Sequence, residues 1–251
     1  MQRYFIDEKY EPKTTYKISG EPYHHITHVM RMKEGAQFYL VFSDQVVIQV
    51  EIIGIYSHEV HVKEIAKENQ EKELSLAITV ACGYPKGDKF EWIVQKATEL
   101  GAAEFIGFPA KTSVVKWDEK KLAKKQQRLA KIAREAAEQS QRSVLPKVHL
   151  LSKQEDFLTL FSHYDYVLVA YEESAKQGET AELVHLLQTV QNNSRVLAIF
   201  GPEGGFLPEE TTAFLQKQAV LCGLGPRILR AETAPLYLLS AVSYHLELLN
   251  K

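Results

Sequence analysis

The chain has few cysteines and no long apolar run. Its 251 residues include only two cysteines, Cys82 and Cys222, which are far apart and form no ligand cluster. This disfavours a disulfide framework and a zinc site, and it fits a reducing compartment best. No apolar run approaches the length that spans a bilayer, and residues 1–7 carry charge too early for a signal peptide. We therefore expect a cytoplasmic protein with no membrane contact.

A strong charge of one sign is also absent. The formal net charge is −2, so any contact with nucleic acid must come from a local patch. The composition, 45% hydrophobic and 25% charged, is typical of a globular protein with one large domain or two unequal ones. His24 and His28 would share one helical face beside His25, but no carboxylate motif accompanies them. We predict no metal site.

The most informative segment is an apolar run that ends in a glycine-rich turn at 196–206. Residues 196–200 predict a buried strand of a mostly parallel sheet. Gly201, Gly204 and Gly205 permit positive φ and leave backbone bare for a ligand. Pro208, followed by two glutamates, indicates the start of a helix. Strand, bare loop and helix together are typical of a ligand site in an open α/β sheet, although a tight turn that needs glycine only for its geometry is an equal alternative.

Two domains are predicted on either side of a polar break at 69–73. Residues 1–72 are β-rich, with a helical segment at 24–32, and predict a small barrel or sandwich. Residues 73–251 alternate strands and helices, which predicts an α/β domain with a parallel sheet. The strands of both domains are expected at 37–42, 46–55, 58–65, 74–81, 105–109, 166–172, 196–200 and 220–225, and the later helices at 90–101, 126–141, 182–191, from 208, and at 236–249.

Two helices of the second domain invite partners. Residues 111–142 carry many more lysines and arginines than acids. A solvated helix face and a phosphate-backbone partner explain this run equally well. The last helix, 236–249, is apolar on almost every side, from which we infer a second copy packed about a two-fold axis.

Three motifs together carry a family resemblance. They are Gly201-Pro202-Glu203-Gly204-Gly205-Phe206, the segment 224–234, and Lys86-Gly87-Asp88-Lys89 with residues 96–101. The chain resembles the RsmE family of SPOUT methyltransferases, which methylate N3 of a uridine in 16S ribosomal RNA. The resemblance extends to residues 3–5, 28–31, 135, 138–139 and 142, and so spans nearly the whole chain.

The resemblance implies more than the residues alone predict. It implies a PUA-like RNA-binding β-barrel at 1–72 and a SPOUT methyltransferase domain at 73–251 with a deep trefoil knot at about 196–249. It also implies S-adenosylmethionine as cofactor and a homodimer. Pattern analysis alone predicts an ordinary doubly wound sheet, because knots are almost absent from folds. One departure concerns the hairpin at 42–45, where a glycine is expected and none is present.

The resemblance also places the cofactor. The activated methyl group of the donor makes a metal unnecessary, so catalysis depends on in-line positioning and on loss of the N3 proton. Arg230 and Glu203 flank the cofactor loops, and Arg142 would reach in from either subunit. A guanidinium would stabilise negative charge on the uracil. Glu203 would act either as a base or by orienting the loop. The cofactor-binding residues implied are Leu168, Ala170, Phe200, Gly201, Pro202, Glu203, Gly204, Gly205, Leu224, Gly225, Ile228, Leu229, Arg230, Glu232, Thr233 and Ala234.

Phosphate contacts to the RNA are expected from basic side chains on the first domain and on the helical stretch 120–134: Arg3, Arg31, Lys124, Arg128 and Arg134. For the isolated arginines, a solvated surface role is the ordinary alternative. Two other functions stay open: a ribose 2′-O-methyltransferase of the same superfamily, and a non-catalytic RNA-binding assembly factor. The intact glycines at 201, 204, 205 and 225 argue against the second.

Overall fold

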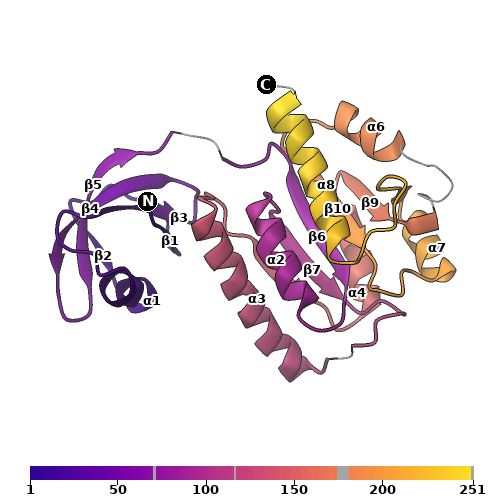
Figure 1. The fold of residues 1–251 in the computed structure, drawn as a ribbon, viewed down its shortest axis with the longest axis horizontal. Helices are drawn as coiled ribbons and strands as arrows, with labels where there is room; N and C mark the ends of the chain where they lie inside the picture. Colours follow the sequence, from indigo (N-terminus) through magenta and orange to yellow (C-terminus); the bar gives the residue numbers. More distant parts are fainter. Residues whose placement is uncertain (70–71, 116, 174–180, 250–251) are drawn as a thin grey trace. The chain divides into compact units, whose positions relative to one another are not determined.

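The computed structural model describes residues 1–69, 72–115, 117–173 and 181–249 (Figure 1). Contacts between Cα atoms divide the chain into two compact units, and each is described by itself. The first comprises Met1–Glu73 and Ala137–Leu145, and the second comprises Leu74–Ala136 and Pro146–Lys251. The predicted break at 69–73 contains residues 70 and 71, which lie outside the described residues.

The first unit contains a five-stranded sheet with the order β1-β3-β4-β5-β2. The pairing of β1 with β3 is parallel and the others are antiparallel. Among the described residues no pairing joins β1 to β2, so the sheet is an open half-barrel and the predicted barrel is not confirmed. The strands are β1 (Arg3–Ile6), β2 (Tyr16–Ile18), β3 (Gln37–Phe42), β4 (Val47–Ile55) and β5 (Val60–Lys67).

Local features of the first unit follow from its sequence. The hairpin between β3 and β4 forms without glycine, because Gln45 itself takes the left-handed conformation at φ 67°. The predicted helical segment is α1 (Gly20–His24), continued by the π-helical η1 (His25–Val29). The rings of His24 and His28 stack at 4.7 Å, as expected of one helical face. Alternate residues of the strands, such as Leu40, fill the core between sheet and helix.

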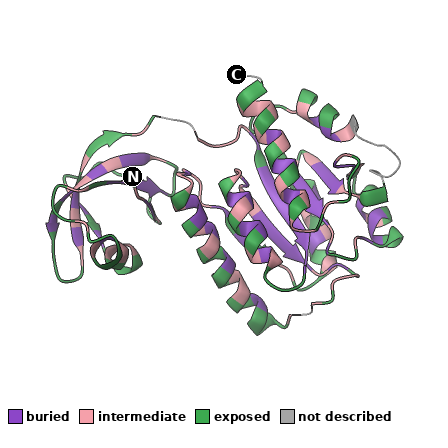
Figure 2. Cartoon of the chain, viewed as in Figure 1, coloured by how far each residue is buried: buried purple, intermediate pink, exposed green. Residues whose placement is uncertain are grey.

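The second unit is built on a six-stranded sheet with the order β11-β9-β10-β6-β7-β8. Every pairing in it is parallel, which confirms the predicted parallel α/β fold. Figure 2 shows buried residues running along its central strands, as expected when helices cover both faces. The strands are β6 (Ala77–Gly83), β7 (Glu104–Phe108), β8 (Lys147–Leu150), β9 (Tyr166–Ala170), β10 (Arg195–Phe200) and β11 (Val220–Cys222).

Alternation along β10 sends side chains into two separate cores. Ala198 and Phe200 pack with one set of helices, whereas Leu197 and Ile199 pack with the other. The first core is covered by α2 (Lys89–Glu99), α3 (Glu119–Gln139), α6 (Ala181–Thr189) and α8 (Thr233–Ser243). The second is covered by α4 (Gln154–Thr159), the 3-10 helix η2 (Leu160–His163) and α7 (Pro208–Gln216).

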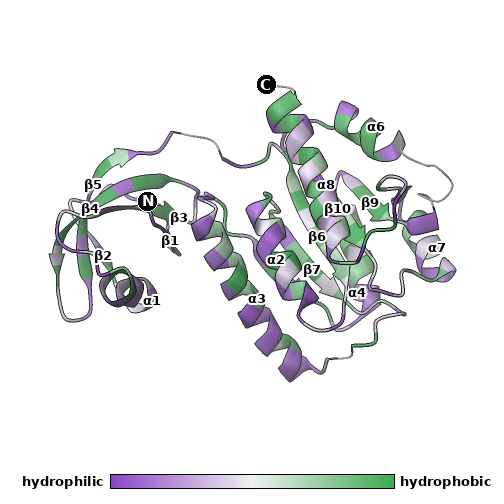
Figure 3. Cartoon of the chain, viewed as in Figure 1, coloured by the Kyte–Doolittle hydropathy of each residue, from purple (hydrophilic) through white to green (hydrophobic). Residues whose placement is uncertain are grey.

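The last long helix of the chain, α8, is more apolar than the other helices of this unit. Figure 3 colours α8 largely hydrophobic, in contrast to α3 with its hydrophilic outer face. α8 continues into the π-helical η3 (Tyr244–Leu249), so the predicted helix at 236–249 is confirmed with an earlier start. Tyr244, Leu248 and Leu249 are 58%, 70% and 58% exposed. Among the described residues, none of these helices is both long and apolar enough to cross a membrane.

Candidate functional site

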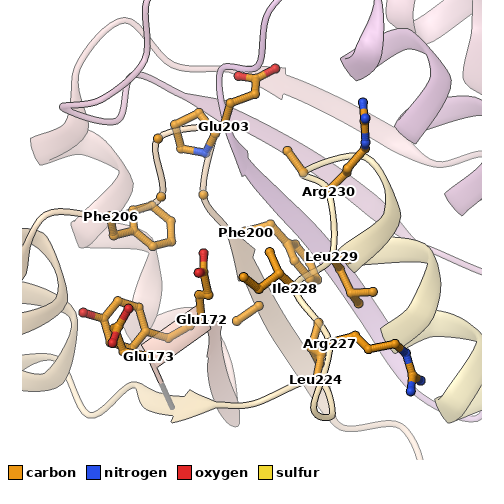
Figure 4. A pocket seen from close by; sticks show the side chains of 18 of the residues that line it. Glu172, Glu173, Phe200, Glu203, Phe206, Leu224, Arg227, Ile228, Leu229 and Arg230 are labelled. Carbon is orange, nitrogen blue, oxygen red and sulfur yellow. The ribbon is translucent and has the colours of Figure 1, made fainter. Parts of the chain in front are cut away.

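A cavity of about 560 Å³ lies at the carboxyl ends of three adjacent parallel strands. Ala170 ends β9, Phe200 ends β10, and Leu224 follows β11; all three line the cavity (Figure 4). Its volume is within the range of small-molecule sites, roughly 300–1,000 Å³. The carboxyl ends of strands are where open α/β sheets bind ligands, because the loops there are free to vary.

The glycine-rich loop after β10 forms one wall of the cavity. Gly205 has φ 65°, and no heavy atom lies within 4 Å of the position that a Cβ there would take. A Cβ on Gly204 would lie 2.9 Å from Cβ of Thr112, so this residue is glycine for space. The hydroxyl of Thr112 donates a hydrogen bond to the carbonyl of Gly205 at 2.6 Å. The loop is therefore held closely from behind and bare toward the cavity.

Glu210 fixes the other end of this loop. It lies in the first turn of α7 and is only 2% exposed. Its carboxylate accepts hydrogen bonds from the backbone N–H of Leu207 at 2.9 Å, from the backbone N–H of Lys111 at 2.9 Å, and from the amide of Gln154 at 2.8 Å. A buried carboxylate with three donors is strongly satisfied, so Glu210 anchors the start of α7.

A small ion-pair network borders the cavity near Glu203. The ammonium of Lys89 lies 2.8 Å from Oε1 of Glu203 and 3.2 Å from Oε2 of Glu232. The backbone N–H of Lys86 donates to Oε1 of Glu203 at 3.1 Å. Burial opposes ionisation of Glu203, but the hydrogen bonds from Lys89 and from backbone amides outweigh it and lower its pKa below the ordinary value. Glu203 is thus a firmly ionised carboxylate and a weak proton acceptor.

The charged side chains differ in how they face the cavity (Figure 4). The carboxylate of Glu172 extends into it, whereas the guanidinium groups of Arg227 and Arg230 point away. Arg230 is exposed, and no carboxylate among the described residues lies within 4 Å of its guanidinium. Its backbone carbonyl accepts hydrogen bonds from the amides of Thr233 and Ala234, which start α8. The interior of the cavity is therefore apolar and acidic, and the exposed guanidinium of Arg230 lies at its rim.

Most of the predicted cofactor residues line this cavity. Leu168, Gly225, Glu232 and Thr233 do not border it in the described structure. Leu168 is instead a core residue, 4% exposed. The roles of the predicted residues stay predictions. Those that do line the cavity are Ala170, Phe200, Gly201, Pro202, Glu203, Gly204, Gly205, Leu224, Ile228, Leu229, Arg230 and Ala234.

Sequence analysis missed several lining residues. Two signals existed: Glu172 and Glu173 follow the apolar strand β9 at its carboxyl end, and Phe206 and Lys89 belong to motifs that carry the resemblance. Their side-chain directions depend on tertiary packing, which the motifs do not reveal. The missed residues are Lys89, Tyr171, Glu172, Glu173, Phe206, Arg227 and Ala231.

Arg3 does not have the predicted RNA-binding role. Its side chain is fully buried in the first unit. The guanidinium donates to the carboxylate of Glu68 at 2.6 Å and to the carbonyl of Arg142 at 3.2 Å. A side chain with no exposed surface cannot contact phosphate, so Arg3 is a core ion-pair residue. Arg142 is itself 4% exposed and paired with Glu73 in the same unit.

The other predicted RNA-binding residues have varied surroundings. Arg31 and Lys124 are exposed. Arg128 is exposed but makes a bidentate pair with Glu91, with both N–O distances at 2.7 Å. Arg134 is only partly exposed. Among the described residues no cluster of three or more His, Cys, Asp or Glu side chains is placed to hold a metal ion.

Comparison with known proteins identifies the class to which this site belongs. A family model described as an RNA methyltransferase domain matches residues 28–243, so the chain belongs to this family of RNA methyltransferases. More particularly, it is 46% identical to ribosomal RNA small subunit methyltransferase E of Bacillus subtilis, over 100% of this chain and 99% of the relative. The predicted resemblance to the RsmE family is confirmed.

Solved structures agree with this assignment. A crystal structure described only as that of a hypothetical protein has a TM-score of 0.91 and 44% identity, covering 99% of this chain and all of the other. A methyltransferase from Legionella pneumophila, in complex with the bound cofactor S-adenosylmethionine, has a TM-score of 0.81 and 27% identity, covering 96% of both chains.

Proposed function

We propose that the protein transfers a methyl group from S-adenosylmethionine to 16S ribosomal RNA of the small ribosomal subunit. The observation that carries this is the cavity bordered by the 201–206 and 224–234 loops, in a chain 46% identical over its whole length to a ribosomal RNA small subunit methyltransferase. A 16S ribosomal RNA substrate places the proposed reaction in the cytoplasm.

The cavity suits the proposed cofactor. Gly205 leaves open space where a side chain would project, so a ligand can lie against the loop backbone. Phe200, Leu224 and Ile228 would offer apolar surface to the adenosine, and Glu172 would offer a carboxylate to a cationic group of the donor. The bound cofactor would supply a methyl group already activated on a sulfonium.

The chain's own residues would position the acceptor base and assist loss of its proton. We assign Arg230 to stabilise negative charge on the target uracil, because its guanidinium is exposed beside the cavity and has no carboxylate partner within 4 Å among the described residues. Glu203 is assigned a positioning role, since a carboxylate with a lowered pKa that is bonded to Lys89 and a backbone amide is a poor base. The predicted catalytic contribution of Arg142, which is paired with Glu73 in the first unit, stays a proposal, with supply from the other subunit as one option.

The acceptor atom is proposed to be N3 of a uridine. A strain lacking the gene, with and without a plasmid copy, would be compared by mass spectrometry of nucleosides digested from its 16S ribosomal RNA. We expect 3-methyluridine to disappear and to return with the plasmid. Loss of a 2′-O-methylated nucleoside instead would support ribose methylation, and no change in either would support a non-catalytic assembly factor.

The finer architecture is proposed on the same family basis. We assign residues 1–72 to a PUA-like RNA-binding domain, in which Arg31 contacts phosphate. Lys124, Arg128 and Arg134, on α3, are assigned further phosphate contacts. Residues 73–251 form the methyltransferase domain, with the segment at about 196–249 tied in a trefoil knot. The return of the 224–234 segment to the cavity already bordered by the 201–206 loop supports this arrangement.

A homodimer is proposed from the exposed apolar residues of the last helix. Tyr237, Tyr244, Leu248 and Leu249 are all more than a third exposed, and the pattern suits a second copy packed on the same surface. Light scattering after gel filtration should give twice the mass of 28.6 kDa. A monomeric mass at micromolar concentration would contradict the dimer and leave the proposed activity untouched.

A further inference from the structure

The motif Lys86-Gly87-Asp88-Lys89 carries part of the family resemblance but has no role in the function proposed above. It connects β6 to α2, and Gly87 takes φ 63° in the turn. Lys89 is the first residue of α2, and its side chain is 30% exposed at the cavity. The turn thus delivers one lysine to the border of the site.

Lys89 joins two loops that come from different parts of the sheet. Its ammonium is 2.8 Å from the carboxylate of Glu203, in the loop after β10, and 3.2 Å from that of Glu232, directly before α8. The backbone amide of Lys86 holds Glu203 from the same turn. Three chain segments that are distant in sequence therefore meet at one ammonium group.

Electrostatics makes this ammonium necessary to the arrangement. Two carboxylates that share one cation would repel each other if the cation were removed. The interaction with Glu203, and secondarily that with Glu232, outweighs desolvation and raises the pKa of Lys89, so the ammonium is charged near neutral pH. Segment 201–206, which contains Glu203, and segment 227–231, which directly precedes Glu232, both line the cavity.

We infer that Lys89 is a positioning residue that holds the two cofactor loops at the spacing the donor requires, acting through Glu203 and Glu232. This inference depends on the proposed function only for the identity of the donor. A site whose walls are held before the ligand arrives loses less entropy on binding. The lysine therefore supports cofactor affinity without touching the reacting atoms.

The test compares Lys89→Met with a matched control on the same helix. Lys96 also lies on α2 and is paired, with Glu99 at 2.8 Å, but it does not border the cavity. By calorimetry, Lys89→Met should bind S-adenosylmethionine about tenfold more weakly than wild type, because the loops lose their preorganisation. Lys96→Met should match wild type within about twofold, and Lys89→Arg should restore most of the affinity.

Kinetics and exchange measurements separate positioning from a purely structural effect. Lys89→Met should raise KM for the cofactor and change kcat little at saturating cofactor, with an unchanged circular dichroism spectrum. Without ligand, hydrogen–deuterium exchange should rise at 202–206 and 225–232 in Lys89→Met and not in Lys96→Met. Wild-type cofactor affinity or unchanged exchange in Lys89→Met would overturn the inference, whereas absence of binding by the wild type would overturn the proposed function instead.

Discussion

Substitution of Gly204 by alanine is the sharpest perturbation of the proposed cofactor wall. The new Cβ would lie 2.9 Å from Cβ of Thr112, whereas carbon atoms in contact prefer about 3.5–4.0 Å. The loop and Thr112 must therefore separate by roughly 0.6 Å or more. That movement also stretches the 2.6 Å hydrogen bond from Thr112 to the carbonyl of Gly205. Overpacking of this kind costs about 1–3 kcal/mol.

The affinity for S-adenosylmethionine measures how much of this strain reaches the site. Since about 1.4 kcal/mol is a factor of ten, G204A should weaken binding by roughly 5- to 100-fold in calorimetry. G205A is the comparison variant. Its Cβ meets no protein atom within 4 Å but projects into the open space proposed for the ligand, at φ 65°, so it should also weaken binding. Removal of the Thr112 side chain should not relieve that loss. Removing the opposing Cβ in G204A/T112G should recover part of the loss relative to G204A. Since T112G also removes the hydroxyl that donates to Gly205, the double variant is compared with T112G alone, and G204A should cost little in that background. Undiminished affinity in folded G204A, or an equal loss of affinity in the T112G background, would refute the steric account of the wall.

Three further predictions concern buried and paired charges. Glu210→Gln replaces an acceptor of three N–H groups by one that brings its own donor, so thermal denaturation should show a loss of about 1–3 kcal/mol; an unchanged Tm would contradict the anchoring role. Arg3→Met leaves the nearly buried Glu68 with Lys72 as its remaining cationic partner among the described residues and should destabilise the protein by about 2–4 kcal/mol. RNA affinity of the folded protein should stay unchanged in a filter-binding assay. The pKa of Glu203 is lowered in the folded state, so ionised Glu203 stabilises the fold at pH values above the unfolded pKa, and this stabilisation is lost as pH falls through the folded pKa. Urea titrations should therefore show the difference in free energy of unfolding between wild type and Glu203→Gln disappearing below about pH 4.

Local sequence was sufficient for the strand, loop and helix around Gly201. The apolar run, the glycines and Pro208 each act within a few residues of where they stand, so their pattern predicts both β10 and the start of α7. The short strand β8 escaped prediction, because Lys147–Leu150 shows only two alternations and its place is set by the parallel pairing with β7. Arg3 is expected from sequence to be exposed, because arginine is rarely buried without a charged partner. Its ion pair with Glu68, which is distant in sequence, allows it to be buried.

The difference between local pattern and long-range packing also limits what could be predicted of the site. The glycines of the 201–205 loop predict its bare backbone, but no local pattern predicts the charged residues at the border of the site. Lys89 approaches Glu203 only because β6 lies next to β10 in the sheet, and that adjacency is a long-range pairing. Sequence spacing between residues 89 and 203 carries no trace of it. The motif containing Lys89 therefore marks the family, while only the fold shows what the lysine contacts.

The state of the α7 N-terminus decides between two ligands that a strand, glycine loop and helix can accept. In dinucleotide sites the free N–H groups of such a helix bind phosphate. Here the carboxylate of Glu210 already accepts the N–H of Leu207 and occupies that end of the helix with a negative charge. Glu172 adds a second negative charge inside the cavity. Among the cations that line the cavity, Lys89 is paired with Glu203, and the guanidinium groups of Arg227 and Arg230 point away from the interior. The donor carries a sulfonium and an ammonium against one carboxylate, so it has a net positive charge. The carboxylate of Glu172 therefore favours the methyl donor over a phosphate at this position.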